Sequence, residues 1–129
     1  MKPTRFYSNK PNSTRWYSNK QEKAVAKTIQ GKQVANSGAT AFNKGDVTTD
    51  MWLIECKTAT TEKKTFSIKR EWIDKNREEA FAMGKPYNAL CFDFGDNGNR
   101  YYVIDEKTFK QLKEAIENEE SNEQDTSNS

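Results

Sequence analysis

The chain has 129 residues, of which 33% are hydrophobic and 31% are charged, and this predicts one domain with a compact core. It contains no histidine, which excludes Ser-His-Asp hydrolases, Cys-His proteases and nucleases that depend on histidine. The net charge of +2 hides an asymmetry, because residues 1–44 carry nine Lys/Arg and one acid whereas residues 114–129 carry six acids and no base. The basic front of the chain favours a polyanionic partner.

The first part of the chain carries a short internal repeat, a basic residue followed by an aromatic pair and Ser-Asn-Lys, at residues 4–10 and 14–20. Interleaved cations and rings suit an arm that follows a nucleic-acid backbone, with Arg5, Arg15 and Lys20 on phosphates and the rings on exposed bases. A flexible leader duplicated by slippage is the alternative. We assign residues 1–18 to a basic aromatic arm.

Ser18 and Gln21 fit a capping box that opens a helix over residues 19–32. This helix is expected to end at or near Gly31, which can take the left-handed cap conformation. Glu22 is its only acid and borders its thin apolar stripe. On its own, an acid in the first turn is explained by the helix dipole.

Residues 45–57 consist of an aspartate preceded by a glycine, a polar segment that predicts a turn, and an apolar segment that predicts a strand. Two charged residues lie within this predicted strand. Because side chains alternate along a strand, Glu55 and Lys57 lie on one face. If residues 48–51 reverse the chain in a hairpin, two registers are plausible, and both turn Asp46 toward the same face as Glu55. The sequence therefore predicts two carboxylates and an ammonium gathered on one face.

Such a group of charges at the end of an apolar hairpin is costly unless a cation compensates it. Mg²⁺ binds one or two carboxylate oxygens, keeps several waters and leaves room for a phosphate. A lysine beside the ion can hold a hydroxide or stabilise developing negative charge. The alternative is a solvated hairpin whose Glu55 and Lys57 face water, but the apolar run from Trp52 to Cys56 favours a buried strand and a metal site.

Asp46 followed by Glu55-Cys56-Lys57 resembles the core motif of PD-(D/E)xK nucleases, although Gly45 stands where the family usually has proline. The resemblance implies that Asp46, Glu55 and the Cys56 carbonyl bind one or two Mg²⁺ ions, for which Mn²⁺ can substitute. It also implies that Lys57 positions and activates the attacking water.

Residues 36–39 and 44–47 are similar to Holliday junction resolvases of the archaeal type and to their phage-encoded relatives, and the similarity covers residues 20–106. It implies a restriction-endonuclease-like core and DNA as the partner. Glu22 matches a glutamate that approaches the metal site in that family, and Ser37 matches a serine at the active site. A small-residue turn without function would look no different from the loop around Ser37.

Lys44 and Lys69 are further candidates for contact with DNA, and a solvated lysine is the alternative for Lys69. Beyond Lys57, a polar segment leads to a helix ending near Met83 and stopped by Gly84. The remaining predicted elements are a strand at residues 87–94, a turn at 95–99, a strand at 100–104 and a helix at 106–117 capped by Asp105.

Cys56 and Cys91 lie in apolar, strand-like runs without a CxxC spacing, which favours buried free thiols in a reducing compartment over a disulfide or a zinc site. No apolar run reaches the length of a membrane span, and the first residues lack the apolar segment of a signal peptide. These features predict a soluble protein without a membrane partner, in the cytoplasm of a bacterial, archaeal or phage-infected cell.

The order helix, strand hairpin with a third strand region, helix, strand, strand, helix predicts an α/β domain with a central mixed sheet and helices on both faces. We assign residues 19–118 to this domain and residues 119–129 to a disordered acidic tail. The prediction is a Mg²⁺-dependent Holliday junction resolvase that works as a homodimer, because symmetrical cutting needs two active sites. A nuclease for flaps, nicks or duplex DNA and a non-catalytic DNA-binding protein are the alternatives.

Overall fold

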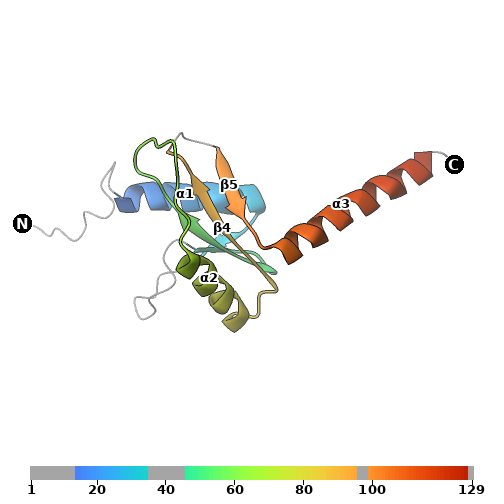
Figure 1. Ribbon diagram of the computed structural model, residues 1–129, viewed down its shortest axis with the longest axis horizontal. Coiled ribbons are helices and arrows are strands. Elements are labelled where there is room, and N and C mark those ends of the chain that lie inside the picture. The colour runs from blue at the N-terminus through green and yellow to red at the C-terminus, as the bar shows by residue number, and fades with distance from the viewer. Residues whose placement is uncertain (1–13, 35–45, 96–98, 128–129) are drawn as a thin grey trace, which may run out of the picture.

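The computed structural model describes residues 14–34, 46–95 and 99–127. Five strands form one mixed sheet in the order β1-β2-β3-β4-β5 (Figure 1). The elements in chain order are α1 (Thr14–Ile29), β1 (Lys32–Gln33), β2 (Asp46–Thr48), β3 (Trp52–Lys57), α2 (Arg70–Ala82), β4 (Tyr87–Asp93), β5 (Arg100–Val103) and α3 (Glu106–Ser127). This confirms the expected α/β fold with a central mixed sheet and flanking helices.

The β2–β3 hairpin has one of the two registers that the sequence allows, with Asp46 directly opposite Glu55. Its turn is held by Thr49, whose Oγ1 accepts a hydrogen bond of 3.0 Å from the Trp52 amide. The Lys85 ammonium, from a distant part of the sequence, donates to the Thr49 carbonyl oxygen at 2.7 Å and stabilises the turn. The hairpin is therefore fixed by polar contacts as well as by the alternation of its side chains.

Strands β3 and β4 pair in parallel and are joined by α2, whereas β4 and β5 form an antiparallel pair. A parallel pair needs a crossover connection, and α2 supplies it. The helix ends as predicted, because Gly84 takes a positive φ of 72° that stops further helical turns.

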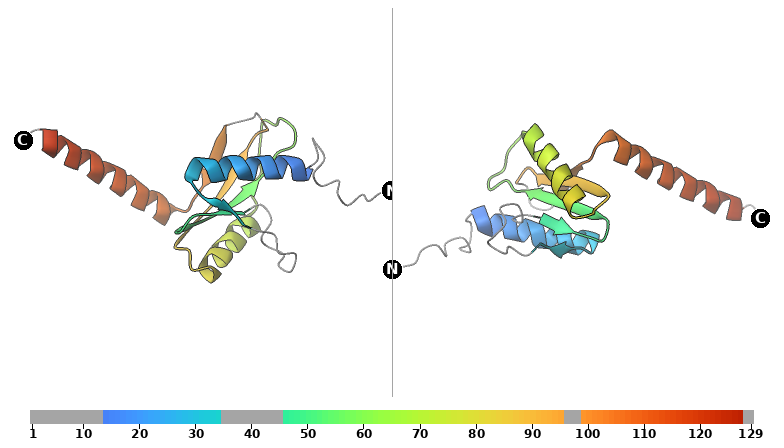
Figure 2. Two further views of the ribbon diagram at one scale, coloured as in Figure 1. Left: turned by 180° about the vertical axis from the view of Figure 1, so that it is seen from behind. Right: turned by 90° about the horizontal axis from the view of Figure 1, so that it is seen from below.

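The two faces of the sheet are covered by different helices (Figure 2). Val25 of α1 packs with Val47, Ile54 and Cys56 in the main apolar core. Because Glu55 alternates with these strand residues, it points to the other face, where α2 packs. The charged residues of the hairpin therefore lie under α2, away from the main core.

Helix α1 differs from its predicted bounds, since it begins at Thr14 and ends at Ile29. Gln21 does not act in a capping box, because its Nε2 donates to the Lys57 carbonyl oxygen at 3.1 Å. Gln30, not Gly31, takes the left-handed conformation, with φ at 57°. Gly31 is needed for another reason: a Cβ there would lie 2.6 Å from the Thr48 carbonyl oxygen on β2.

The third strand of the amino-terminal half is also placed differently. It is the two-residue β1, which pairs with β2 ahead of the hairpin, and no strand lies between Lys57 and α2. So short a strand has too few residues to show a period of two in the sequence.

Helix α3 begins as predicted, with the Thr108 amide donating to Oδ1 of Asp105 at 2.8 Å. It then continues to Ser127, so the prediction of disorder from residue 119 is wrong for the part of the tail that the structure describes. Beyond its first turn, α3 packs against none of the other described helices and strands and extends away from the sheet (Figures 1 and 2). In the described ranges, no helix is both long and apolar enough to cross a membrane.

Candidate metal centre

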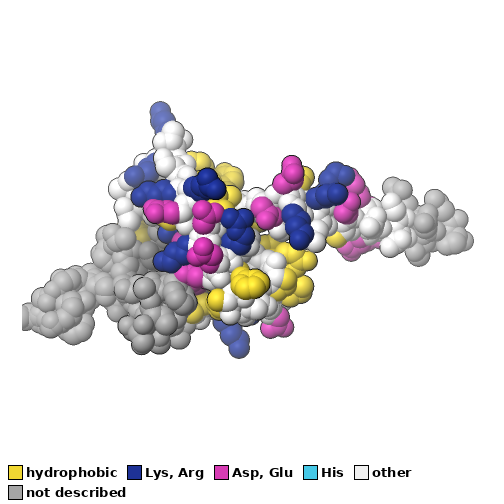
Figure 3. All heavy atoms as spheres, turned by 60° about the horizontal axis from the view of Figure 1, so that its bottom comes forward, with side chains coloured by type: hydrophobic (Ala, Val, Ile, Leu, Met, Phe, Trp, Pro, Cys, Tyr) yellow, Lys and Arg dark blue, Asp and Glu magenta, His cyan; other side chains and the backbone are white. Residues whose placement is uncertain are grey.

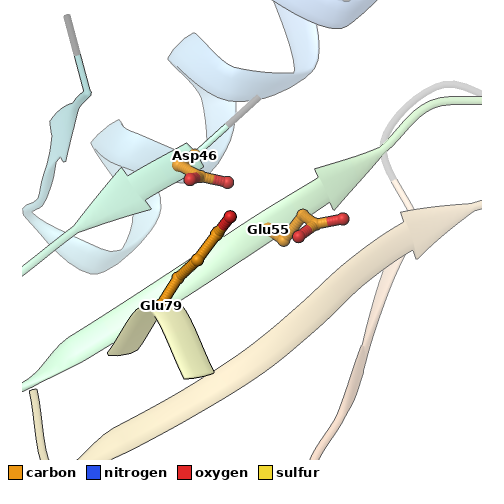
Figure 4. A group of neighbouring side chains, drawn as sticks. All are labelled: Asp46, Glu55 and Glu79. Atoms are coloured by element: carbon orange, nitrogen blue, oxygen red, sulfur yellow. The ribbon is translucent and has the colours of Figure 1, made fainter. Parts of the chain in front are cut away.

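Three carboxylates from three different elements meet under α2: Asp46 on β2, Glu55 on β3 and Glu79 on α2 (Figure 4). One oxygen from each lies within 4.8 Å of the others. All three residues are buried, with exposed fractions of 2%, 8% and 7% for Asp46, Glu55 and Glu79. Three carboxylates so close together and so far from solvent are the central feature of the molecule.

The fold explains why they meet. The hairpin register sets Asp46 beside Glu55 on adjacent strands, so both side chains leave the sheet on the same face. Helix α2 crosses that face, and Glu79 follows Trp72 and Asn76 along its inward stripe at the spacing of successive helical turns. In Figure 4 the Glu79 side chain extends from the helix toward Asp46.

Burial makes this concentration of negative charge unfavourable. Burial, with added repulsion from Glu55 and Glu79, raises the pKa of Asp46 from 3.8 to about 8. Burial likewise raises the pKa of Glu79. Its Oε2 accepts no hydrogen bond, and the nearest cation is the Lys75 ammonium, 3.9 Å away. A buried carboxylate oxygen without a donor calls for a cation.

Lys57 joins the cluster from the end of β3. Its Nζ lies 2.7 Å from Oε2 of Glu55 and 4.3 Å from the centre of the Trp72 ring. The ring therefore holds the ammonium beside the carboxylates, and 27% of the lysine side chain stays exposed. The expected grouping of Asp46, Glu55 and Lys57 on one face is confirmed.

The residues present fit a hard divalent cation. In octahedral Mg²⁺ sites the oxygens lie about 2.1 Å from the ion, so two ligand oxygens are separated by up to about 4.2 Å. Three ligands of one octahedral ion include at least two neighbouring pairs at only about 3.0 Å, so the carboxylate oxygens, which lie within 4.8 Å of one another, would draw closer around a bound ion. The donor set consists of oxygens alone, which suits Mg²⁺ or Mn²⁺ better than zinc.

Glu79 is the ligand candidate that the sequence prediction missed. The signal is visible in hindsight: a glutamate interrupts the inward stripe of α2, seven residues after Trp72 and directly before the buried Ala80. Its neighbour Glu78 is exposed, so composition alone could not tell which of the two acids turns inward.

Glu22 does not join the cluster. It lies on α1, which covers the other face of the sheet, and its Oε1 accepts a hydrogen bond from Nε2 of Gln33 at 3.3 Å. Its charge still contributes to the raised pKa of Asp46. A direct catalytic part for Glu22 is therefore not supported by the described arrangement.

The side chain of Cys56 also points to the α1 face, where it lies in the main core opposite Cys91. Both cysteines are free and buried, as predicted. The metal-binding role expected for Cys56 concerns its backbone carbonyl and stays a prediction.

The residues expected to contact DNA are placed only in part. Lys69 lies at the start of α2 with its Nζ 5.7 Å from the centre of the Trp72 ring, close to Lys57. Lys20 is exposed on α1, and Arg15 belongs to the same helix. The remaining candidates lie outside the described residues: Arg5, Ser37 and Lys44.

The fold and the carboxylate cluster define an α/β protein with a candidate site for a divalent cation. No protein-family model matches the chain, and neither a curated protein nor a solved structure matches it at a significant level.

Proposed function

We propose that the protein is a Mg²⁺-dependent endonuclease that hydrolyses phosphodiester bonds in DNA. Asp46, Glu55 and Glu79 are its metal ligands, and Lys57 positions the attacking water. The observation that carries the proposal is the buried Glu79 oxygen that no donor satisfies, facing two further buried carboxylates. A cation bound among these groups would remove both the repulsion and the unsatisfied oxygen.

When bound, a divalent cation at this position supplies Lewis acidity and lowers the pKa of a coordinated water. The protein side chains do the rest. The carboxylates fix the position of the site between a strand pair and a helix, and their burial limits competition from bulk water. A dry, rigid setting of this kind strengthens each electrostatic contact with a phosphate.

Lys57 forms the shorter of the two ion pairs that the described residues make with the cluster, 2.7 Å to Glu55 against 3.9 Å from Lys75 to Glu79, and its side chain remains partly exposed. Its ammonium donates toward Glu55, and the Trp72 ring limits its movement. From there it can hold a water or hydroxide in line with a phosphate and stabilise negative charge that develops on the phosphate oxygens.

The proposed substrate is branched DNA, with the Holliday junction first, because the motif of Asp46 with Glu55-Cys56-Lys57 resembles that of junction resolvases. Symmetrical cutting of a four-way junction requires two copies of the site, so the proposed active form is a homodimer. The products are a 5′-phosphate and a 3′-hydroxyl, and the proposed place of action is the cytoplasm.

The test is cleavage of four labelled DNA substrates, a four-way junction, a flap, a duplex and a single strand, with Mg²⁺ or with a chelator. We expect cutting only with Mg²⁺ or Mn²⁺, and two symmetrical nicks in the junction. Lys57→Met should reduce the rate at least about a hundredfold, whereas Lys110→Met, at an exposed lysine on α3, serves as the matched control and should retain most of it.

The alternatives give different results. Cutting of flaps or duplex in preference to the junction would keep the enzyme and reject the resolvase. DNA binding without any cutting in either metal would reject the enzyme and leave a non-catalytic DNA-binding protein. In that case Asp46→Asn would change the stability of the protein, and neither the wild type nor the variant would cut DNA.

A further inference from the structure

A row of aromatic side chains begins beside the Lys57 ammonium and crosses the sheet to its edge. Lys57, Phe92 and Tyr101 are direct neighbours on β3, β4 and β5, so they share the face on which the carboxylate cluster lies. The row thus starts at the residue that we assign to the attacking water and leads away from the metal centre.

The rings are in mutual contact. Phe66 stacks on Phe92 with ring centres 4.8 Å apart, and Phe92 lies 5.7 Å from Tyr101. Phe94 meets Tyr101 edge to face at 5.7 Å, and Trp72 lies 6.4 Å from Phe66. We call these five residues the aromatic row. No member is fully buried, and Tyr101 is 48% exposed.

The segment that crosses the aromatic row is basic. Between β3 and α2 it carries Lys63, Lys64 and Lys69, all exposed, with Glu62 as the only acid in that segment. The Lys63 amide donates to the Phe94 carbonyl oxygen at 2.8 Å, which fastens this segment beside the rings. With three lysines and one acid, this segment is a local concentration of positive charge. Over the face drawn in Figure 3, cations and carboxylates are interspersed.

We propose that the aromatic row is a stacking surface for unpaired DNA bases adjacent to the bond that is cut. This inference rests on the proposed function and specifies its substrate as DNA with unstacked bases near the cleavage site. Partly exposed rings flanked by lysines bind single strands because bases stack on the rings while the ammonium groups bind the phosphates. Bases inside a duplex are already stacked on one another and have no free faces to offer.

The alternative is that the aromatic row is a small core, which packs the segment between β3 and α2 against the sheet. This alternative explains only part of the observations. It accounts for the stack of Phe66 on Phe92. It does not account for the exposure of Tyr101 at the outer end or for the three exposed lysines of the segment that lies beside the rings. An anionic partner with flat apolar groups matches both features.

The experiment measures the affinity of the full chain for a dye-labelled oligothymidylate and for a blunt duplex, by fluorescence anisotropy in chelator so that no strand is cut. Tyr101→Leu keeps apolar bulk but loses the π face. We expect it to weaken single-strand binding about tenfold, within the range for loss of one stacked base, and to leave duplex binding unchanged. Tyr101→Trp should retain the wild-type affinity.

Phe81→Leu is the matched control, because Phe81 is an aromatic residue on α2 with 86% exposure that lies outside the row. It should leave both affinities unchanged. Wild-type affinity in Tyr101→Leu, or equal weakening on single strand and duplex, would overturn the stacking surface.

If Tyr101→Leu acts as expected but no substrate is cut with Mg²⁺, the stacking surface stands and the proposed nuclease fails. If the protein cuts DNA with Mg²⁺ while Tyr101→Leu binds the single strand with wild-type affinity, the proposed nuclease stands and the stacking surface fails.

Discussion

Glu79 contributes a buried carboxylate whose Oε2 has no hydrogen-bond donor and has the Lys75 ammonium 3.9 Å away as its cationic neighbour. Asp46 and Glu55 supply the other two carboxylates, and the Lys57 ammonium pairs with Glu55. The candidate metal centre therefore depends on Glu79, which completes a site of which the hairpin provides two ligands.

Glu79→Gln should weaken Mn²⁺ binding by at least about tenfold, because it replaces a charged ligand with a neutral amide. Isothermal titration calorimetry of the metal-free protein measures this directly. Glu78→Gln is the control, since Glu78 is the preceding residue on α2 and is exposed. Equal Mn²⁺ affinity for the two variants would remove Glu79 from the site.

The raised pKa of Asp46 predicts how stability depends on pH. In the unfolded chain this carboxyl loses its proton near 3.8, but in the fold it keeps it until about pH 8. Between these values the folded state binds more protons, so stability of the metal-free protein falls as pH rises. Asp46→Asn removes this penalty and should be more stable than wild type at pH 8 by on the order of 1 kcal/mol.

The comparison is made by urea unfolding in chelator at pH 5 and pH 8. The advantage of Asp46→Asn should grow with pH, and an advantage that is the same at both values would contradict the raised pKa. For the same reason, wild-type affinity for Mg²⁺ should increase up to about pH 8, because Asp46 must lose its proton before it binds the ion.

At the scale of elements, α3 depends on its own cap because it has little tertiary support. The Asp105 side chain accepts from the Thr108 amide, and hydrogen bonding with the Thr108 side chain, together with this amide bond, lowers the pKa of Asp105. Asp105→Ala should cost the helix about 1 kcal/mol, whereas Asp105→Asn should cost much less because asparagine caps equally well.

Far-UV circular dichroism reports the effect as lost helix signal. Because a lowered pKa favours the ionised form in the fold, the cap contribution is present at neutral pH and is lost as pH falls below the ordinary value for aspartate. If Asp105→Ala and Asp105→Asn have the same helix content as wild type, the cap does not support α3.

The sequence was most informative where one element determines its own geometry. The alternation through Glu55 and Lys57 predicted the shared face, and the short turn restricted Asp46 to registers that point the same way. Glu79 could not be predicted in this manner, because its position depends on how α2 crosses the sheet. Nor could the length of α3, since its acidic, polar end carries the composition of a disordered tail.

At the scale of the whole molecule, the body and α3 form two parts that differ in packing and charge. Residues 109–123 are all exposed, including the apolar Phe109 and Ile116 at 59% each. Truncation after Lys110 should therefore leave the thermal unfolding midpoint of the body within about 2 °C of wild type. A large loss of stability would show that α3 packs against another part of the chain or against a second copy.

The same truncation removes the six acids of residues 114–129. If these acids repel DNA from the rest of the chain, the truncated protein should bind duplex DNA more tightly at low salt, and added salt should reduce the difference. Unchanged affinity at low salt would mean that the acidic end of α3 lies too far from the DNA to affect it.

The most direct measurement is a crystal structure of the protein grown with Mn²⁺, with the metal located by its anomalous signal. We expect one peak between β2, β3 and α2, from a metal ion bonded at about 2.2 Å to oxygens of Asp46, Glu55 and Glu79. Absence of a peak at saturating Mn²⁺, or a peak that none of these carboxylates contacts, would contradict the metal centre and the nuclease built on it.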